Sequence, residues 1–140
     1  AASSFLSGMI REPIAGVRAV CPVDPDTPVA LSSPTRTLDG ILRAAAVSTA
    51  EWGSTTAMTL PARSTTPREM AEALDRVAGA GTSDLIDWQR DAAIEAIVGS
   101  WPSQFRTDRA ARLGLTADDS FDGIVAAYLD GVDAGSGAPA

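Results

Sequence analysis

Apolar residues recur every three or four positions in about six stretches of the chain, which is the spacing of one face of an α-helix. The strongest stretch begins at Ser33, a residue suited to the N-cap, with Pro34 at the first helical position. The apolar positions that follow on one face of this helix are Leu38, Ile41, Leu42 and Ala45. The pattern therefore predicts an amphipathic helix.

A second clear helix start lies at Thr66, where Glu69 completes a capping box and Pro67 takes the first helical position. Gly79 provides its stop. The remaining helices are predicted over residues 3–12, 91–100 and 108–113, and from residue 119 or 120 onward. Residues 134–140 are small and Gly-rich, so we expect them to form a flexible tail.

Strand signals are few, short and widely separated along the sequence. The best is Thr55–Leu60, an alternating segment bounded by Gly53 and Pro61. The other candidates are residues 19–23, 29–31 and 85–88. Such strands make a poor sheet by themselves. The pattern predicts an α/β chain, or α+β when taken alone, that is rich in helix and whose strands complete a sheet elsewhere.

The composition removes several classes of function. The chain has 140 residues, a net charge of −7, no His and no Lys, so all 11 positive charges are Arg. A Ser-His-Asp triad, an imidazole zinc site and a Tyr-Lys proton relay are therefore excluded. The acidic balance argues against nucleic acid and anionic membranes as partners. No run is long enough to span a bilayer, no targeting signal is visible, and a single cysteine fits the cytoplasm.

Three features that suggest chemistry have simpler structural explanations. Asp24 and Asp26 lack the Gly and the carboxylate that a calcium loop needs further on, so they indicate a turn. Gly79-Ala80-Gly81 follows a helix instead of a strand, which is a helix stop and not a dinucleotide fingerprint. Cys21 has no base beside it in sequence and favours a packed thiol. We therefore predict no catalytic residue and no metal ligand in this chain.

A few residues stay open as ligand contacts. Ser3 and Ser4 lie at a helix N-terminus, where hydroxyls and free N–H groups either bind a polyhydroxy ligand or simply cap the helix. Arg11 and Arg106 are isolated cations that suit a carboxylate or a phosphate, although exposed Arg is common. None of them alone identifies a function.

Several stretches resemble the C-terminal part of extended short-chain dehydrogenase/reductases, the NAD-dependent epimerase/dehydratase family. They are residues 1–5 (Ala-Ala-Ser-Ser-Phe), 8–13 (Gly-Met-Ile-Arg-Glu-Pro), 19–23 (Ala-Val-Cys-Pro-Val), 31–34 (Leu-Ser-Ser-Pro), 59–61 (Thr-Leu-Pro), 66–70 (Thr-Pro-Arg-Glu-Met) and 99–106, with Gly99-Ser100-Trp101-Pro102 and Phe105-Arg106. Within that family the chain resembles the D-erythronate dehydrogenase-like branch, often labelled nucleoside-diphosphate-sugar epimerase. The resemblance covers residues 1 to about 131.

The resemblance implies an N-terminal Rossmann half, outside this chain, that binds NAD or NADP and carries a Tyr-x-x-x-Lys pair. Residues 1–133 would form the substrate-binding part, and the strand at Thr55–Leu60 would join the edge of the Rossmann sheet. Ser3, Ser4 and Phe5 would follow the strand that faces nicotinamide and substrate, and Arg106 would approach the substrate. Residues 27–34 lack the Arg and the His-Val-Asp-Asp run of many sugar-nucleotide epimerases, which favours a small sugar acid.

The sequence thus predicts the substrate-binding part of an NAD(P)-dependent sugar or sugar-acid dehydrogenase or epimerase. The full-length protein would be the enzyme, and the chain alone need not be one. A homodimer remains open. Two alternatives are a stand-alone binding or interaction domain and a hydrolase with paired carboxylates, although no such pair stands out.

Overall fold

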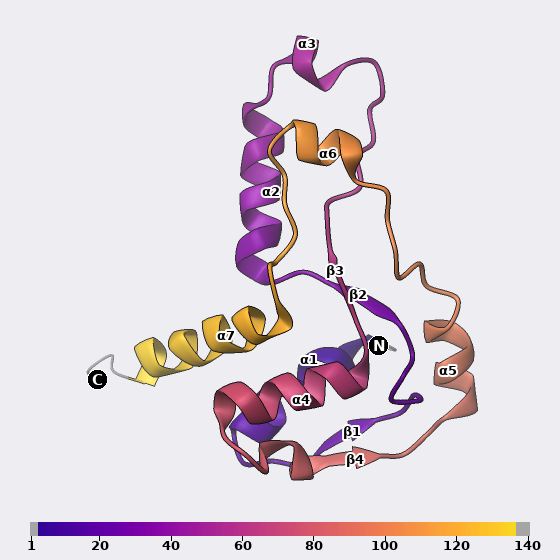
Figure 1. The fold of residues 1–140 in the computed structure, drawn as a ribbon, viewed down its shortest axis with the longest axis vertical. Helices are drawn as coiled ribbons and strands as arrows, with labels where there is room; N and C mark the ends of the chain where they lie inside the picture. Colours follow the sequence, from indigo (N-terminus) through magenta and orange to yellow (C-terminus); the bar gives the residue numbers. More distant parts are fainter. Residues whose placement is uncertain (1–2, 137–140) are drawn as a thin grey trace.

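A computed structural model describes residues 3–136 and shows a body with a projecting lobe (Figure 1). The elements are α1 (Ser4–Ile14), β1 (Ala19–Cys21), β2 (Val29–Leu31), α2 (Pro34–Ala46), α3 (Thr49–Trp52), β3 (Arg63–Thr65), α4 (Pro67–Ala78), η1 (Thr82–Leu85), β4 (Ile86–Trp88), α5 (Ala92–Val98), α6 (Asp108–Arg112) and α7 (Phe121–Ser136). The lobe holds α2, α3 and α6, and the body holds the other helices. The predicted fold class, helix-rich with a few short strands, is confirmed.

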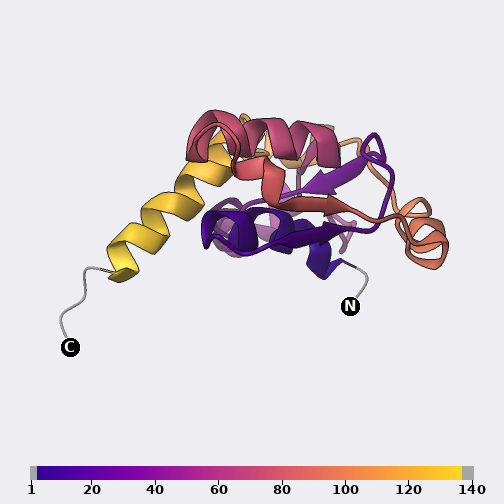
Figure 2. The same ribbon diagram turned by 90° about the horizontal axis from the view of Figure 1, so that it is seen from below.

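The four strands form two separate two-stranded sheets. β1 pairs with β4 in parallel, with Ala19 opposite Ile86, and β2 pairs with β3 antiparallel, with Val29 opposite Thr65. Strands of three residues cannot hold a sheet together on their own. They persist because α1 and α4 pack beside them (Figure 2).

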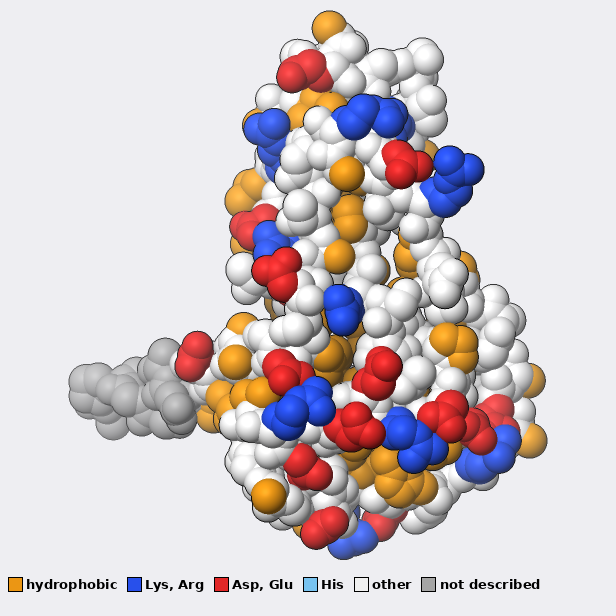
Figure 3. Space-filling view, viewed as in Figure 1, with side chains coloured by type: hydrophobic (Ala, Val, Ile, Leu, Met, Phe, Trp, Pro, Cys, Tyr) orange, Lys and Arg blue, Asp and Glu red, His pale blue; other side chains and the backbone are white. Residues whose placement is uncertain are grey.

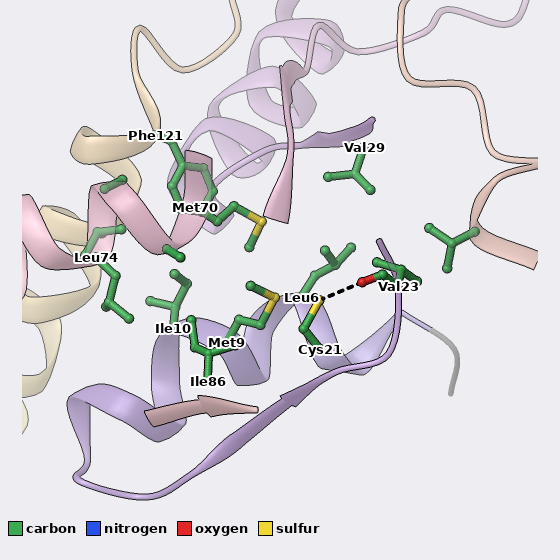
Figure 4. Packing of buried hydrophobic residues seen from close by; sticks show 14 residues of the cluster. Leu6, Met9, Ile10, Cys21, Val23, Val29, Met70, Leu74, Ile86 and Phe121 are labelled. Carbon is green, nitrogen blue, oxygen red and sulfur yellow. Dashed lines mark hydrogen bonds between the residues drawn. The ribbon is translucent and has the colours of Figure 1, made fainter. Parts of the chain in front are cut away.

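The core lies between α1, α4 and the first turns of α7. Met9, Met70, Leu74 and Val125 are fully buried there, and Figure 4 shows the two methionines pointing toward each other between the helices. Cys21 is also fully buried, and its thiol donates to the carbonyl of Val23 at 3.6 Å. The prediction of a packed thiol is confirmed, and burial raises the pKa of Cys21.

The capping signals located the helices well. Ser33 accepts a hydrogen bond from the Arg36 N–H at 3.1 Å, and Thr66 and Glu69 form the predicted capping box. The sequence prediction missed α3, although Ser48 and Glu51 carry the same Ser-x-x-Glu pattern. The first helix also runs two residues beyond its predicted end and includes Pro13.

The predicted helix is confirmed as α2, but its apolar stripe stays largely exposed among the described residues. Leu38, Ile41 and Leu42 are 56%, 55% and 60% exposed. The buried residue of α2 is Gly40, where an added Cβ would lie 3.0 Å from Leu60 Cδ2. The contacts of α2 with the rest of the described chain are therefore made by the face that carries Gly40 and by its N-cap, Ser33.

The segment Thr55–Leu60 forms no strand within residues 3–136 and pairs with none of the described strands. Its expected partner, the edge of a sheet outside this chain, lies beyond the described residues. Arg109 holds the start of the segment, with Nη1 donating to the Ala57 carbonyl at 3.0 Å and Nη2 to that of Thr55 at 2.9 Å. The strand that forms within the chain is β3, just beyond Pro61.

Part of the segment predicted to be a flexible tail is helical. α7 continues to Ser136, so residues 134–136 are helical, and residues 137–140 lie outside the described part of the chain. None of the described helices is both long enough and apolar enough to cross a membrane.

Candidate functional site

A cavity of about 650 Å³ opens between α1, the β2–α2 junction and α7. Its walls are mostly apolar; those from the helices include Leu6, Ile10, Met70, Phe121 and Ile124. These side chains also belong to the core or pack against it, so the cavity is a hollow in the edge of the core. A hollow of this size lies in the range of small-molecule sites.

Polar groups occur at one side of the cavity, around the start of α2. Ser33 is buried, and the carboxylate of Asp118 accepts both its N–H at 2.9 Å and its hydroxyl at 2.7 Å. Ser32 and Thr35 line the same side. The Asp118 carboxylate thus occupies the anion-attracting helix end, where it also orients the Ser33 hydroxyl toward the Arg36 N–H.

Arg11 lies at the cavity and differs from most other arginines of the chain. Within residues 3–132 no carboxylate or carbonyl pairs with it, whereas Arg18, Arg68 and Arg76 each pair with an aspartate at the surface. Among the described residues, no Asp or Glu lines the cavity, although the chain has 18 acidic residues. The cavity therefore favours an apolar occupant that brings a negative charge.

The four predicted contact residues lie elsewhere. Ser3 is the N-cap of α1 but makes no side-chain cap, and Ser4 accepts from the Ser7 hydroxyl through its carbonyl at 3.0 Å. Phe5 is half-buried against the core. Arg106 is 94% exposed and pairs with Asp108 at 3.5 Å. None of the four is among the described residues that line the cavity.

Outside the cavity, charged side chains form ion pairs at the surface or accept hydrogen bonds from nearby serines. Arg18 hydrogen-bonds Asp87 and Arg76 hydrogen-bonds Asp122, which lowers the pKa of each carboxyl. Asp75 accepts the Ser83 hydroxyl and N–H, and its pKa is lowered in the same way. None of these three carboxylates lines the cavity, and each has a hydrogen-bond partner within the described residues.

The described residues do not fit a dinucleotide or a metal. Gly79 and Gly81 end α4 and open the short 3₁₀-helix, so no glycine loop leads from a strand into a long helix. No group of three or more Cys, Asp and Glu side chains within the described residues is arranged to hold a metal ion. The polar side chains of the cavity lining are hydroxyls and the Arg11 guanidinium, which can bind and orient a ligand.

Sequence reasoning missed the cavity because its two sides are far apart along the chain. Ser33 and Asp118 are 85 residues apart, and the wall from α7 follows nearly 90 residues after β2. The signal that was present is Arg11, one turn from Ser7 on the helix that opens the chain. The sequence marks Arg11 as an isolated cation, but its position relative to neighbouring residues indicates no partner for it.

No protein-family model matches the chain. Two curated relatives match nearly all of it: the D-erythronate dehydrogenase of Cupriavidus necator, 44% identical over 135 residues, and that of Haemophilus influenzae, 33% identical over 130 residues. They cover 96% and 93% of the chain. The chain spans only 41% of the length of each.

Solved structures agree on the fold. The nucleoside-diphosphate-sugar epimerase of Agrobacterium tumefaciens superposes with a TM-score of 0.88 at 32% identity, over 93% of this chain and 38% of that one. L-threonine 3-dehydrogenase of Trypanosoma brucei superposes with a TM-score of 0.79 at 17% identity, over 99% of this chain and 42% of that one. At this identity the likeness shows the fold alone. In both cases the chain matches less than half of a longer protein.

Proposed function

Because the chain resembles a part of the extended short-chain dehydrogenase/reductases, over nearly all its length and with D-erythronate dehydrogenases among its relatives, we propose that it is the substrate-binding part of such an enzyme. The whole protein would be an NAD(P)-dependent dehydrogenase or epimerase. Its substrate would be a small sugar or sugar acid. The division of labour would place the redox chemistry outside this chain.

The observation that carries this proposal is the 44% identity to a D-erythronate dehydrogenase across 135 of the 140 residues. It is supported by what the described residues lack. With no His and no Lys, and with Cys21 fully buried, no side chain is poised as a nucleophile or as a base near neutral pH. A binding role is consistent with this set of residues.

Ser3, Ser4 and Phe5 remain our proposed substrate contacts, with Arg106 as a fourth. The hydroxyls at the start of α1 would hydrogen-bond substrate hydroxyls, and Arg106 would hold a carboxylate once Asp108 releases it. An exposed ion pair of this kind costs little to open. These contacts would orient the substrate and raise its effective concentration at the reacting atoms.

The nicotinamide cofactor would be held mainly by the rest of the protein, where it would accept or return a hydride. The residues of this chain do not form its site, so no redox step is assigned to them. The single buried thiol suits a reducing compartment, and we place the enzyme in the cytoplasm. A homodimer is compatible with this assignment.

A second candidate function is a stand-alone binding or interaction domain. The observation that favours it is the core of the body, in which Met9, Met70 and Leu74 are fully buried without any further chain. The mass of the protein in its source cell distinguishes the two. A mass near the 14.4 kDa of this chain favours the binding domain, and roughly twice that mass favours the enzyme.

Calorimetric titration of NAD into residues 1–140 tests the division of labour. We expect no measurable heat, because the described residues contain no dinucleotide site. Saturable binding in the micromolar range would contradict the proposal.

A further inference from the structure

The cavity is separate from the four proposed substrate contacts, none of which is among the described residues that line it. Its lining comes from α1, the β2–α2 junction, α4 and α7. Figure 3 shows hydrophobic side chains at the surface where α7 leaves the body. A hollow of about 650 Å³ holds a molecule larger than a small sugar acid, so the cavity suits a second ligand.

The walls of the cavity select a molecule with an apolar body. The rings of Phe121 and Tyr128 lie about two turns apart on α7, and Ile124 lines the cavity between them. From α1, Leu6 and Ile10 line the same cavity, and both are buried. A ligand with several hydroxyls would lose hydrogen bonds to water here and regain few of them, which is costly. An aliphatic or aromatic body gains free energy from the same burial.

The charge at the cavity favours a carboxylate on that ligand. Within the described residues, Arg11 is the single charged side chain that lines the cavity, and it has no ion-pair or hydrogen-bond partner within residues 3–132. The other anion-attracting group nearby, the N-terminus of α2, is already occupied. The Asp118 carboxylate accepts the N–H and the hydroxyl of Ser33 there. A negative group on the ligand is therefore directed to Arg11.

We propose that the cavity binds a monocarboxylic acid with an apolar aliphatic or aromatic body. The carboxylate pairs with the exposed Arg11 guanidinium, and the body lies between α1 and α7. Burial of the body supplies most of the affinity, and the charged pair distinguishes the acid from the corresponding alcohol. The site is thus a second binding site, distinct from the proposed contacts for a sugar or sugar acid.

Titration of octanoate into residues 1–140, below the concentration at which octanoate forms micelles, provides the test. Calorimetry measures the affinity, and amide chemical shifts locate the ligand. We expect saturable binding that shifts the amides of Leu6, Arg11 and Tyr128 but not those of α5, which does not line the cavity. The alcohol 1-octanol should bind about tenfold more weakly, since it lacks the charged pair. D-erythronate should cause no shifts around the cavity.

Gly131 offers a variant that fills the cavity and leaves the core intact. It lines the cavity on α7, and a Cβ added there meets no atom within 4 Å. Gly131→Leu should therefore lower the affinity for octanoate by about tenfold or more, because its side chain occupies the space of the ligand. The helix should persist, since leucine favours a helix more than glycine does. Asp130→Leu, on the same helix but outside the lining, should bind octanoate as the unmodified chain does.

The charged pair has its own variant. Arg11→Gln should weaken octanoate binding about tenfold and leave 1-octanol binding unchanged. Arg112→Gln, at an exposed site outside the cavity, should change neither affinity. The proposal is overturned by absence of octanoate binding, or by an affinity for octanoate that neither Gly131→Leu nor Arg11→Gln lowers. It is also overturned if D-erythronate binds in the cavity as tightly as octanoate, because the walls would then accept a polyhydroxy ligand.

Discussion

The Asp118 carboxylate receives both hydrogen bonds that Ser33 offers, from the N–H at 2.9 Å and from the hydroxyl at 2.7 Å. Ser33 is only 6% exposed, so this pair anchors the start of α2 to the loop that precedes α7. The two residues thus fix the polar side of the cavity relative to its apolar wall.

Replacing Asp118 by Ala should therefore lower the free energy of unfolding by about 1–3 kcal/mol, since a buried N–H and hydroxyl lose a charged acceptor. Denaturant unfolding followed by circular dichroism measures the change. Asp119→Ala is the matched control, with no side-chain hydrogen bond within the described residues and an expected change within about 0.5 kcal/mol. Equal losses in the two variants would show that the Ser33 contact contributes nothing.

Arg109 should control access to residues 52–60. Its guanidinium lies 5.1 Å from the centroid of the Trp52 ring and donates to the carbonyls of Trp52, Thr55 and Ala57. A lysine cannot span these acceptors. We expect Arg109→Lys to raise the rate of thermolysin cleavage before Met58 and Leu60. The rise should be roughly tenfold, because this is the change in the open population that the loss of one hydrogen bond produces. Arg112→Lys on the same helix should leave cleavage unchanged, and a similar rise there would refute the assignment.

The free energy of unfolding should decrease in acid, in part because Asp75 becomes protonated. Hydrogen bonds from Ser83 lower its pKa in the folded chain, so folding favours the carboxylate. This contribution is present above the unfolded pKa of about 4 and is lost as pH falls through the lower folded value. Asp75→Asn should flatten that part of the curve of unfolding free energy against pH. Asp130→Asn, at an exposed site without a side-chain hydrogen bond within the described residues, should preserve the original slope.

Arg106 should matter for substrate and not for folding. In a chimera in which this chain replaces the matching segment of the Cupriavidus necator D-erythronate dehydrogenase, Arg106→Ala should raise KM for D-erythronate about tenfold. The effect on kcat should be smaller, because the change removes a charged hydrogen bond to the substrate. Its melting temperature should not move, since the side chain is 94% exposed. Arg112→Ala is the control. A KM that is unchanged by Arg106→Ala would remove this residue from the site.

The parts of the fold that could be predicted are those written in adjacent residues. Ser33 with Pro34, and Thr66 with Glu69, locate two helix starts because a cap acts within one turn. Cys21 was predicted to be packed because nothing near it in sequence activates a thiol. A cap specifies where a helix begins but not which element packs on it. The exposure of Leu38 therefore could not be predicted from the sequence.

The errors have a common physical origin. Thr55–Leu60 alternates like a strand, but a strand needs a neighbouring edge, and the described residues offer none. The apolar face of α2 is likewise largely exposed among the described residues. Both features show that a local pattern specifies a strand or a helix face but not the element that packs on it. The cavity escaped prediction for the opposite reason, since it depends on Asp118 reaching Ser33 across 85 positions.

Turnover of D-erythronate with NAD, measured for the chimera and for residues 1–140 side by side, tests the account most directly. We expect NADH formation by the chimera and none by the chain alone, because in the proposed division of labour this chain would bind the substrate while the rest of the protein would perform the redox step. NADH formation by the chain alone, or a folded chimera that binds NAD yet forms no NADH, would contradict it.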